Sequence, residues 1–197
     1  MNPLELIAAA LGVANIVLLV RRSVWNYPFG MAMVALYAFV FWEAKLYSEA
    51  GLQIFFFAMQ AWGWYLWFEA GGSGGRDDRI GDGRVPVRWL DWPSRVVWLM
   101  VTAGLSLNLG WAMDRFTDAA VPSADSAISG ASVAAQILLA TRRVENWVLW
   151  IVIDIGAIAL YASRGLYPTM ALYVVFLAFS VVGLKEWIAA ARQKSAI

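Results

Sequence analysis

A single acidic residue, Asp154, lies about two helical turns inside a strongly apolar run that begins at Trp147. A carboxylate at the centre of a bilayer costs roughly 2.5 kcal/mol or more, so an acid in such a run usually has a function. At ~100° per residue, one narrow helical face carries Trp147, Trp150, Asp154 and Tyr161, with Asn146 at its edge. An acid framed by aromatic rings can hold an organic cation away from water. The alternative is structural, because a buried acid can also brace neighbouring helices.

Amide side chains in two other apolar runs are further candidates. Gln60 and Trp64 share one helical face, and Gln136 lies on a serine-bearing face between residues 126 and 141. A buried amide can join two helices, usually for only about 0.6 kcal/mol, or it can bind an amide or hydroxyl of a ligand. The residues alone leave both alternatives open.

Composition places the chain in the membrane and narrows its chemistry. Of the 197 residues, 61% are hydrophobic and 15% charged, whereas soluble domains are nearer half apolar and a quarter charged. A net charge of +1 gives no reason to expect nucleic acid binding. The chain has no Cys and no His, which removes disulfides, thiol nucleophiles, imidazole bases and the commonest transition-metal ligands. We therefore expect no cofactor, no metal and no enzymatic activity, since no nucleophile–base pair or carboxylate dyad is evident.

Hydrophobic run lengths predict an all-α protein with seven transmembrane helices. The predicted spans are residues 4–20, 27–44, 49–68, 95–113, 126–141, 147–163 and 168–188. The first run lacks a basic leader and is interpreted as a span rather than a signal peptide. Loops on one side carry twelve of the 15 basic residues, and the other side carries only Lys45, Arg115 and Arg164. The positive-inside rule then predicts an outside N-terminus and a cytoplasmic C-terminus.

The two halves of the chain resemble each other at an offset of 120 residues. This offset pairs Gly63 with Gly183, Trp67 with Trp187 and Asn26 with Asn146, and the Arg21-Arg22 turn matches Arg142-Arg143 with a shift of one residue. We infer two parallel three-helix repeats, residues 1–68 and 126–188, joined by a linking helix at 95–113. Segment 69–94, with glycines at 71, 72, 74 and 75, is expected to be a solvated cytoplasmic loop, and 189–197 a cytoplasmic tail. This 3+1+3 arrangement is like that of small sugar permeases, which bind substrate between repeats near the midplane.

The pattern Trp-x-x-Trp-x-x-x-Asp at 147–154 and its surroundings resemble the bacterial PnuC-type nicotinamide riboside transporters. Lys45-Leu46-Tyr47 through Gly63-Trp64-Tyr65 adds to the likeness, which spans nearly the whole chain. The resemblance implies a vitamin transporter of the bacterial inner membrane that feeds NAD biosynthesis. It also implies facilitated diffusion, substrate trapping by a cytoplasmic kinase, and a homotrimer. Its site would comprise Asn146, Trp147, Trp150 and Asp154, with Gln136 and Gln60 as polar partners.

The residues leave the identity of the substrate open. Family members for thiamine and for riboflavin also exist, and an acid in an aromatic setting suits the cations nicotinamide riboside and thiamine better than neutral riboflavin. The lack of a second deep acid or a His favours uniport over proton coupling. A non-transporting membrane scaffold is the remaining alternative, and saturable uptake would exclude it.

Overall fold

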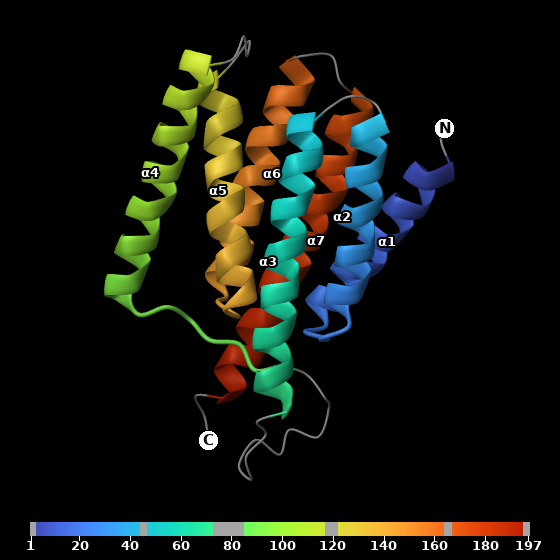
Figure 1. The fold of residues 1–197 in the computed structure, drawn as a ribbon. Coiled ribbons are helices and arrows are strands. Elements are labelled where there is room, and N and C mark those ends of the chain that lie inside the picture. Colours follow the sequence, from blue (N-terminus) through green and yellow to red (C-terminus); the bar gives the residue numbers. More distant parts are fainter. Residues whose placement is uncertain (1–2, 44–46, 73–84, 117–121, 164–166, 195–197) are drawn as a thin grey trace. The chain divides into compact units, whose positions relative to one another are not determined.

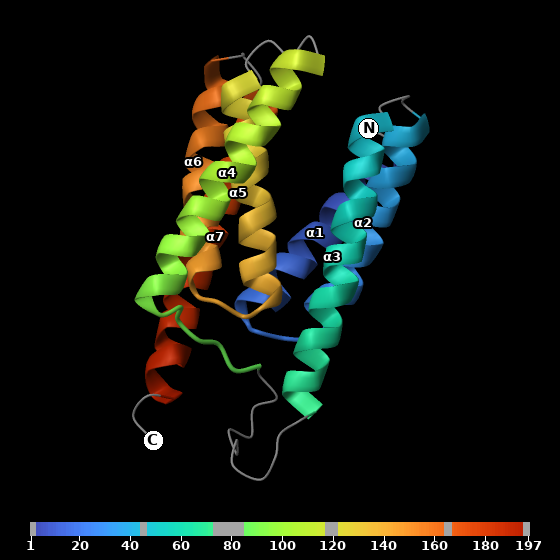
Figure 2. The same ribbon diagram turned by 60° about the vertical axis from the view of Figure 1, so that its left-hand side comes forward.

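The computed structural model describes residues 3–43, 47–72, 85–116, 122–163 and 167–194, and these form seven α-helices (Figures 1 and 2). The helices are α1 (Pro3–Val20), α2 (Asn26–Glu43), α3 (Tyr47–Gly72), α4 (Trp92–Phe116), α5 (Pro122–Ala140), α6 (Glu145–Ser163) and α7 (Tyr167–Lys194). The predicted all-α class with seven helices is confirmed. Several helices run past the predicted spans, notably α3 and α7, because backbone hydrogen bonding continues into polar sequence beyond the apolar run.

Membrane crossing is a separate question from helix formation. Within the described residues, Tyr173–Arg192 of α7 is the one helix long and apolar enough to span a bilayer, with a mean hydropathy of 1.8. Ala10–Val20 and Ser126–Ala140 are shorter apolar helices. The other predicted spans therefore stay predictions.

The chain divides into two compact units. The first unit comprises residues 1–86 and 140–142, and in it α2 packs against both α1 and α3. The second unit comprises residues 87–139 and 143–197, and its helix α6 packs on α7.

Small residues set the spacing of α4 and α5 in the second unit. A Cβ added at Gly130 would lie 2.5 Å from the Ser106 hydroxyl, and one at Gly110 would lie 2.8 Å from that of Ser126. Helices that lack bulky side chains at the crossing point can approach closely, a common device in membrane helix pairs.

The turns that precede α2 and α6 have the same backbone geometry. Arg22 and Arg142 both adopt positive φ, 58° and 61°. The next amide then bonds to the carbonyl five residues earlier, Ser23 N to Leu18 O at 2.9 Å and Arg143 N to Leu138 O at 2.8 Å. Both are helix C-terminal motifs closed by a left-handed residue, a conformation that costs an L-residue roughly 1–2 kcal/mol. The 120-residue offset thus pairs Arg22 with Arg142, and the one-residue shift expected from the sequence is wrong.

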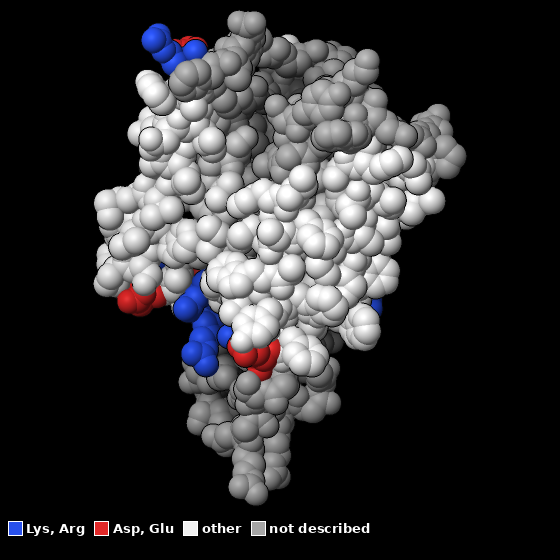
Figure 3. Space-filling view, in the orientation of Figure 1, with Lys and Arg blue, Asp and Glu red and all other residues white. Residues whose placement is uncertain are grey.

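Residues 85–91 form an extended strap that leads into α4 (Figure 1). Val85, Val87 and Leu90 are buried, at 1%, 2% and 8% exposure, so the prediction of a solvated loop is wrong for this part. Val85 and Val87 are two residues apart, so an extended backbone directs both to the same side, and Leu90 is buried outside this alternation. In the space-filling view, acidic and basic side chains meet where α4 begins, and the flank of α4 beyond them is uncharged until its far end (Figure 3).

Candidate functional site

The predicted site face of α6 is mostly buried. Asn146, Trp147 and Asp154 are 0%, 3% and 3% exposed, and Trp150 is of intermediate exposure. The structure therefore places the deep acid and the two tryptophans on the inward part of α6, as a helical face requires. Tyr161 is helical, but its side chain is outside the described part of the chain.

Asp154 is held by a serine of the neighbouring helix. The Ser180 hydroxyl on α7 donates to Asp154 Oδ2 at 2.9 Å, and Ser180 is itself 5% exposed. A buried carboxylate accepts several hydrogen bonds when ionised, so a single hydroxyl leaves capacity for a second, charged partner.

Trp147 packs as part of the helix–helix contact. Its ring meets Trp187 edge to face, with centroids 5.6 Å apart and an interplanar angle of 87°. A Cβ at Gly183 would lie 2.5 Å from the Trp147 ring, so the glycine makes room for it. Trp150, less buried and one turn further along, has more of its surface free for a ligand.

The first unit contains the same contact with a different aromatic residue. Tyr27 meets Trp67 edge to face, with centroids 5.3 Å apart and an angle of 84°, and a Cβ at Gly63 would lie 2.6 Å from the Tyr27 ring. Each of these residues is 120 positions before its counterpart in the second unit. Because Tyr27 serves as a packing residue, the geometry of Trp147 is first of all architectural.

Two buried polar atoms at the start of α6 are unusual. Asn146 Oδ1 and Trp147 Nε1 have no hydrogen-bond partner within the described residues. Asn146 uses its Nδ2 to bond Arg143 O at 2.5 Å, which caps the turn. Buried polar groups without a partner are rare in folded proteins and often have a functional explanation.

The other predicted polar residues belong to other helices. Gln136 is 8% exposed on α5 of the second unit. Gln60 and Trp64 belong to α3 of the first unit, with exposures of 8% and 38%. Gln60 contacts the α2 backbone at Gly30, where a side chain would collide with both the Gln60 amide and Asn15 Nδ2.

Ser180 is not among the site residues predicted from the sequence. The 120-residue offset between the halves could have indicated Ser180, because it pairs Ser180 with the candidate Gln60. The same offset pairs Asp154 with Val34. An acid and a hydroxyl in one unit thus replace a valine and an amide in the other.

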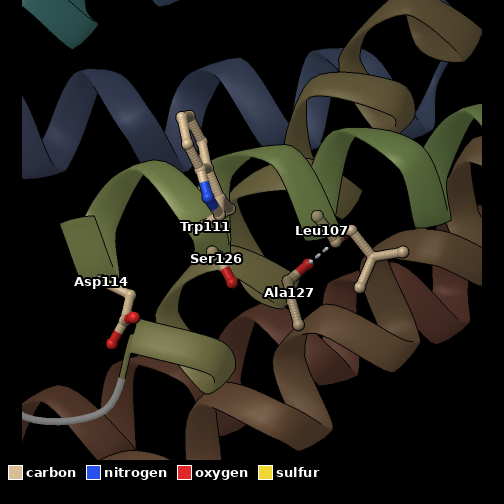
Figure 4. A pocket seen from close by; sticks show the side chains of 7 residues that line it. Leu107, Trp111, Asp114, Ser126 and Ala127 are labelled. Atoms are coloured by element: carbon tan, nitrogen blue, oxygen red, sulfur yellow. Dashed lines mark hydrogen bonds between the residues drawn. The ribbon is translucent and has the colours of Figure 1, made fainter.

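The described surface has a pocket elsewhere, between α4 and α5 (Figure 4). Its volume is about 420 Å³, and Leu107, Trp111, Asp114 and Ser126 are among its lining residues. None of the predicted site residues lines it, so it is separate from the candidate site on α6. Within the described residues, no group of three or more acidic side chains is placed to hold a metal ion.

The similarity of this chain to known proteins indicates the class of protein to which its fold corresponds. A solved structure described as that of the vitamin B3 transporter PnuC matches 98% of this chain and 84% of its own, with a TM-score of 0.75 and 27% identity. The nicotinamide riboside transporter PnuC of Escherichia coli (strain K12) is 28% identical over 97% of this chain and 87% of its own length. The riboflavin/roseoflavin transporter RibM of Streptomyces davaonensis is 24% identical over the same shares. The fold is therefore that of a vitamin transporter.

The family follows from a more direct match. The family model described as nicotinamide mononucleotide transporter matches residues 2–189, nearly the whole chain. The chain belongs to this family.

Proposed function

We propose that this protein imports nicotinamide riboside across the bacterial inner membrane by facilitated diffusion. The single observation that carries the proposal is the buried Asp154–Ser180 pair beside the half-buried Trp150 on α6. A carboxylate in a dry aromatic setting attracts a cationic ring, and the ring of nicotinamide riboside is a pyridinium. The names of the relatives and of the solved structure support this substrate class.

Each predicted residue receives a role in this proposal. Asp154 offsets the ring charge and Trp150 stacks on the ring, with Trp147 shaping the wall behind it. Asn146 is positioned to offer its free carbonyl oxygen to the substrate amide or a ribose hydroxyl. Gln136, Gln60, Trp64 and Tyr161 are proposed as further contacts.

Thiamine is the second candidate substrate, because its thiazolium is also a cation. Riboflavin is neutral and gains nothing from an acid at position 154, although one relative bears the name of a riboflavin transporter. A site that buries an unpaired carboxylate disfavours a neutral ligand, since the charge would remain uncompensated. We therefore rank nicotinamide riboside first, thiamine second and riboflavin third.

The transport cycle is proposed to be alternating access by two three-helix repeats, α1–α3 and α5–α7, joined by α4. The matched turns before α2 and α6 and the matched aromatic–glycine contacts support the duplication. Uptake would be driven by phosphorylation of the imported substrate in the cytoplasm. The N-terminus would be outside, the C-terminus cytoplasmic, and the assembly a homotrimer.

The test is thermal stabilisation of the purified protein by a panel of vitamins, since a ligand that binds only the folded state raises the melting temperature. The panel contains nicotinamide riboside, thiamine, riboflavin and their phosphates. Reduced nicotinamide riboside is the matched control, because it keeps the ribose and the amide but loses the ring charge. We expect stabilisation by the oxidised form and little by the reduced form. Equal stabilisation by both would remove Asp154 from recognition, and absence of saturable uptake in proteoliposomes would favour the scaffold alternative.

A further inference from the structure

The start of the site helix α6 is bound to the strap by an ionic contact. The Leu90 amide donates to both carboxylate oxygens of Glu145, at 3.0 and 3.2 Å, and Arg95 Nε donates to Glu145 Oε1 at 2.9 Å. Glu145 is the first residue of α6, and Arg95 lies in the first turn of α4. We call Leu90, Arg95 and Glu145, with Arg88 and Arg143, the strap clasp.

Backbone pairing continues the clasp along the strap. Arg88 and Arg143 form a parallel bridge, and Val144 N donates to Arg88 O at 3.1 Å. Arg143 Nη1 donates to Trp89 O at 3.4 Å, and the Arg95 guanidinium lies over the Trp89 ring, 5.3 Å from its centroid. The contacts thus join the strap, the start of α4 and the start of α6 into one network.

The carboxylate of Glu145 is used in an uncommon way. An acid in the first turn of a helix ordinarily favours the positive end of that helix's own dipole. Its two oxygens instead receive donors from the strap and from α4, and only 15% of the side chain is exposed. Charge-assisted hydrogen bonds with limited exposure to water are the stronger kind and fix geometry well.

The turn before α2 also bonds to the strap, from Val85 N to Arg22 O at 3.2 Å, but the carboxylate of the clasp is specific to the unit that carries the acid. The residue 120 positions before Glu145 is Trp25, which is 68% exposed. The turns around both residues have the same backbone geometry, so the turn does not need a glutamate to form. What distinguishes the second turn is that Asp154 follows it on the same helix.

We propose that Glu145 is a positioning residue for substrate binding, an inference that rests on the proposed function. Trp150 and Asp154 follow it by five and nine residues. At ~1.5 Å per residue they lie about 7.5 and 13.5 Å along the helix axis. Anchoring the first residue of α6 fixes the position of the helix along its axis and its rotation about that axis. It thereby holds Asp154 opposite Ser180 and Trp150 at its place beside the substrate.

The first test is Glu145→Gln, with Glu186→Gln, an exposed acid of α7, as the matched control. We expect Glu145→Gln to raise both the Kd for nicotinamide riboside and the KM for uptake about tenfold, because small misplacements of binding groups weaken binding strongly. The maximal rate should stay within about twofold of the parent's rate. Glu186→Gln should leave both unchanged. Arg95→Gln keeps the Leu90 bonds and should give a smaller rise in KM, which provides a second variant if Glu145→Gln does not fold.

The decisive test restores the anchor without the carboxylate. The chain has no Cys, so Arg88→Cys with Arg143→Cys creates a unique pair. Bridged neighbours on extended segments lie about 5 Å apart, within the Cα range of a disulfide. In the Glu145→Gln background, we expect oxidation to restore most of the lost affinity and reductant to remove it again. An unchanged Kd for Glu145→Gln, or an oxidised pair that binds as weakly as the reduced one, would overturn the positioning role. If the parent itself binds no vitamin, the proposed function fails instead.

Discussion

Two regions of this molecule share the same backbone geometry but differ in their polar side chains. The turn before α2 and the turn before α6 share a left-handed arginine and the same hydrogen bonds, Asn26 Nδ2 to Ser23 O and Asn146 Nδ2 to Arg143 O. Each following helix then packs an aromatic residue against a glycine and a tryptophan of the next helix.

Many positions differ between the two units, and three of these differences change the polar contacts. Where the first unit has Val34 and Gln60, the second has Asp154 and Ser180, and Glu145 replaces the exposed Trp25. Positions that match in both units serve the helix packing, which both need. Some positions that differ, such as Tyr27 and Trp147, keep the same packing contact, whereas others change the polar contacts, and these second positions are the candidates for function.

The largest effect should come from removing the acid that distinguishes the second unit. Asp154→Asn keeps an acceptor for Ser180 but loses the charge that attracts a cation. Hydrogen bonds and contacts to charged groups contribute about 1.5–3 kcal/mol, so the Kd for nicotinamide riboside should rise roughly 10- to 100-fold. Ligand titration of the melting temperature and proteoliposome uptake measure this.

The control for that change is Asp114→Asn, an exposed acid of the same unit. It should bind as the parent does. Because Asp154→Asn also removes a buried charge, its melting temperature without ligand should not fall. Unchanged uptake by Asp154→Asn would mean that the difference between the units is not the basis of binding.

A smaller effect, a loss of thermal stability, is expected to be similar in both units. Gly183→Ala and Gly63→Ala would place a Cβ 2.5 and 2.6 Å from the rings of Trp147 and Tyr27. Overpacking of a tight contact costs typically 1–3 kcal/mol, so both variants should unfold at lower temperature. Gly104→Ala is the matched control. A Cβ there meets nothing within 4 Å, and Ala is the better helix former by about 1 kcal/mol, so its melting temperature should not drop.

The Gly63→Ala and Gly183→Ala variants can also show that the contacts in the two units are not equivalent. If Gly63→Ala is tolerated while Gly183→Ala unfolds the protein, the two contacts are not equivalent in energy, whatever their geometry. If only Gly183→Ala weakens ligand binding, Trp147 has a role in the site beyond packing.

Much of the fold could be predicted because hydrophobic length is a one-dimensional signal. Seven apolar runs gave seven helices, and the Asn26–Asn146 and Trp67–Trp187 matches correspond to positions of equal geometry. The burial of Asp154 also followed from its place on the α6 face.

The partners of these residues could not be predicted in the same way. That Ser180 would meet Asp154 depends on the rotation of α7, and that Leu90 would bond Glu145 depends on the path of a segment with mixed polarity. Neither helical rotation nor the path of a loop is encoded in periodicity. The valines at 85 and 87 alternate in a way that indicates an extended buried segment, but the charged residues around them obscured it.

The smallest expected effect concerns the first turn of α4. Asp91 precedes α4, and its carbonyl accepts the first helical bond, from Arg95 N at 3.1 Å. A hydrogen bond from the Ser94 hydroxyl lowers the pKa of Asp91 below its ordinary value. A carboxyl with a lowered pKa stabilises the folded state above its unfolded pKa, near 4, and this contribution is lost as the pH falls through the lower, folded value.

Acidification should therefore loosen the first turn of α4 before it affects α1–α3. Hydrogen exchange of the amides of residues 94–96 should accelerate as the pH is lowered below about 4, once the intrinsic pH dependence of exchange is corrected for. Asp91→Asn should remove this pH dependence, because asparagine caps a helix without titrating. Equal acceleration in the first turn of α2 would show that the response is global, and the cap would then not account for it.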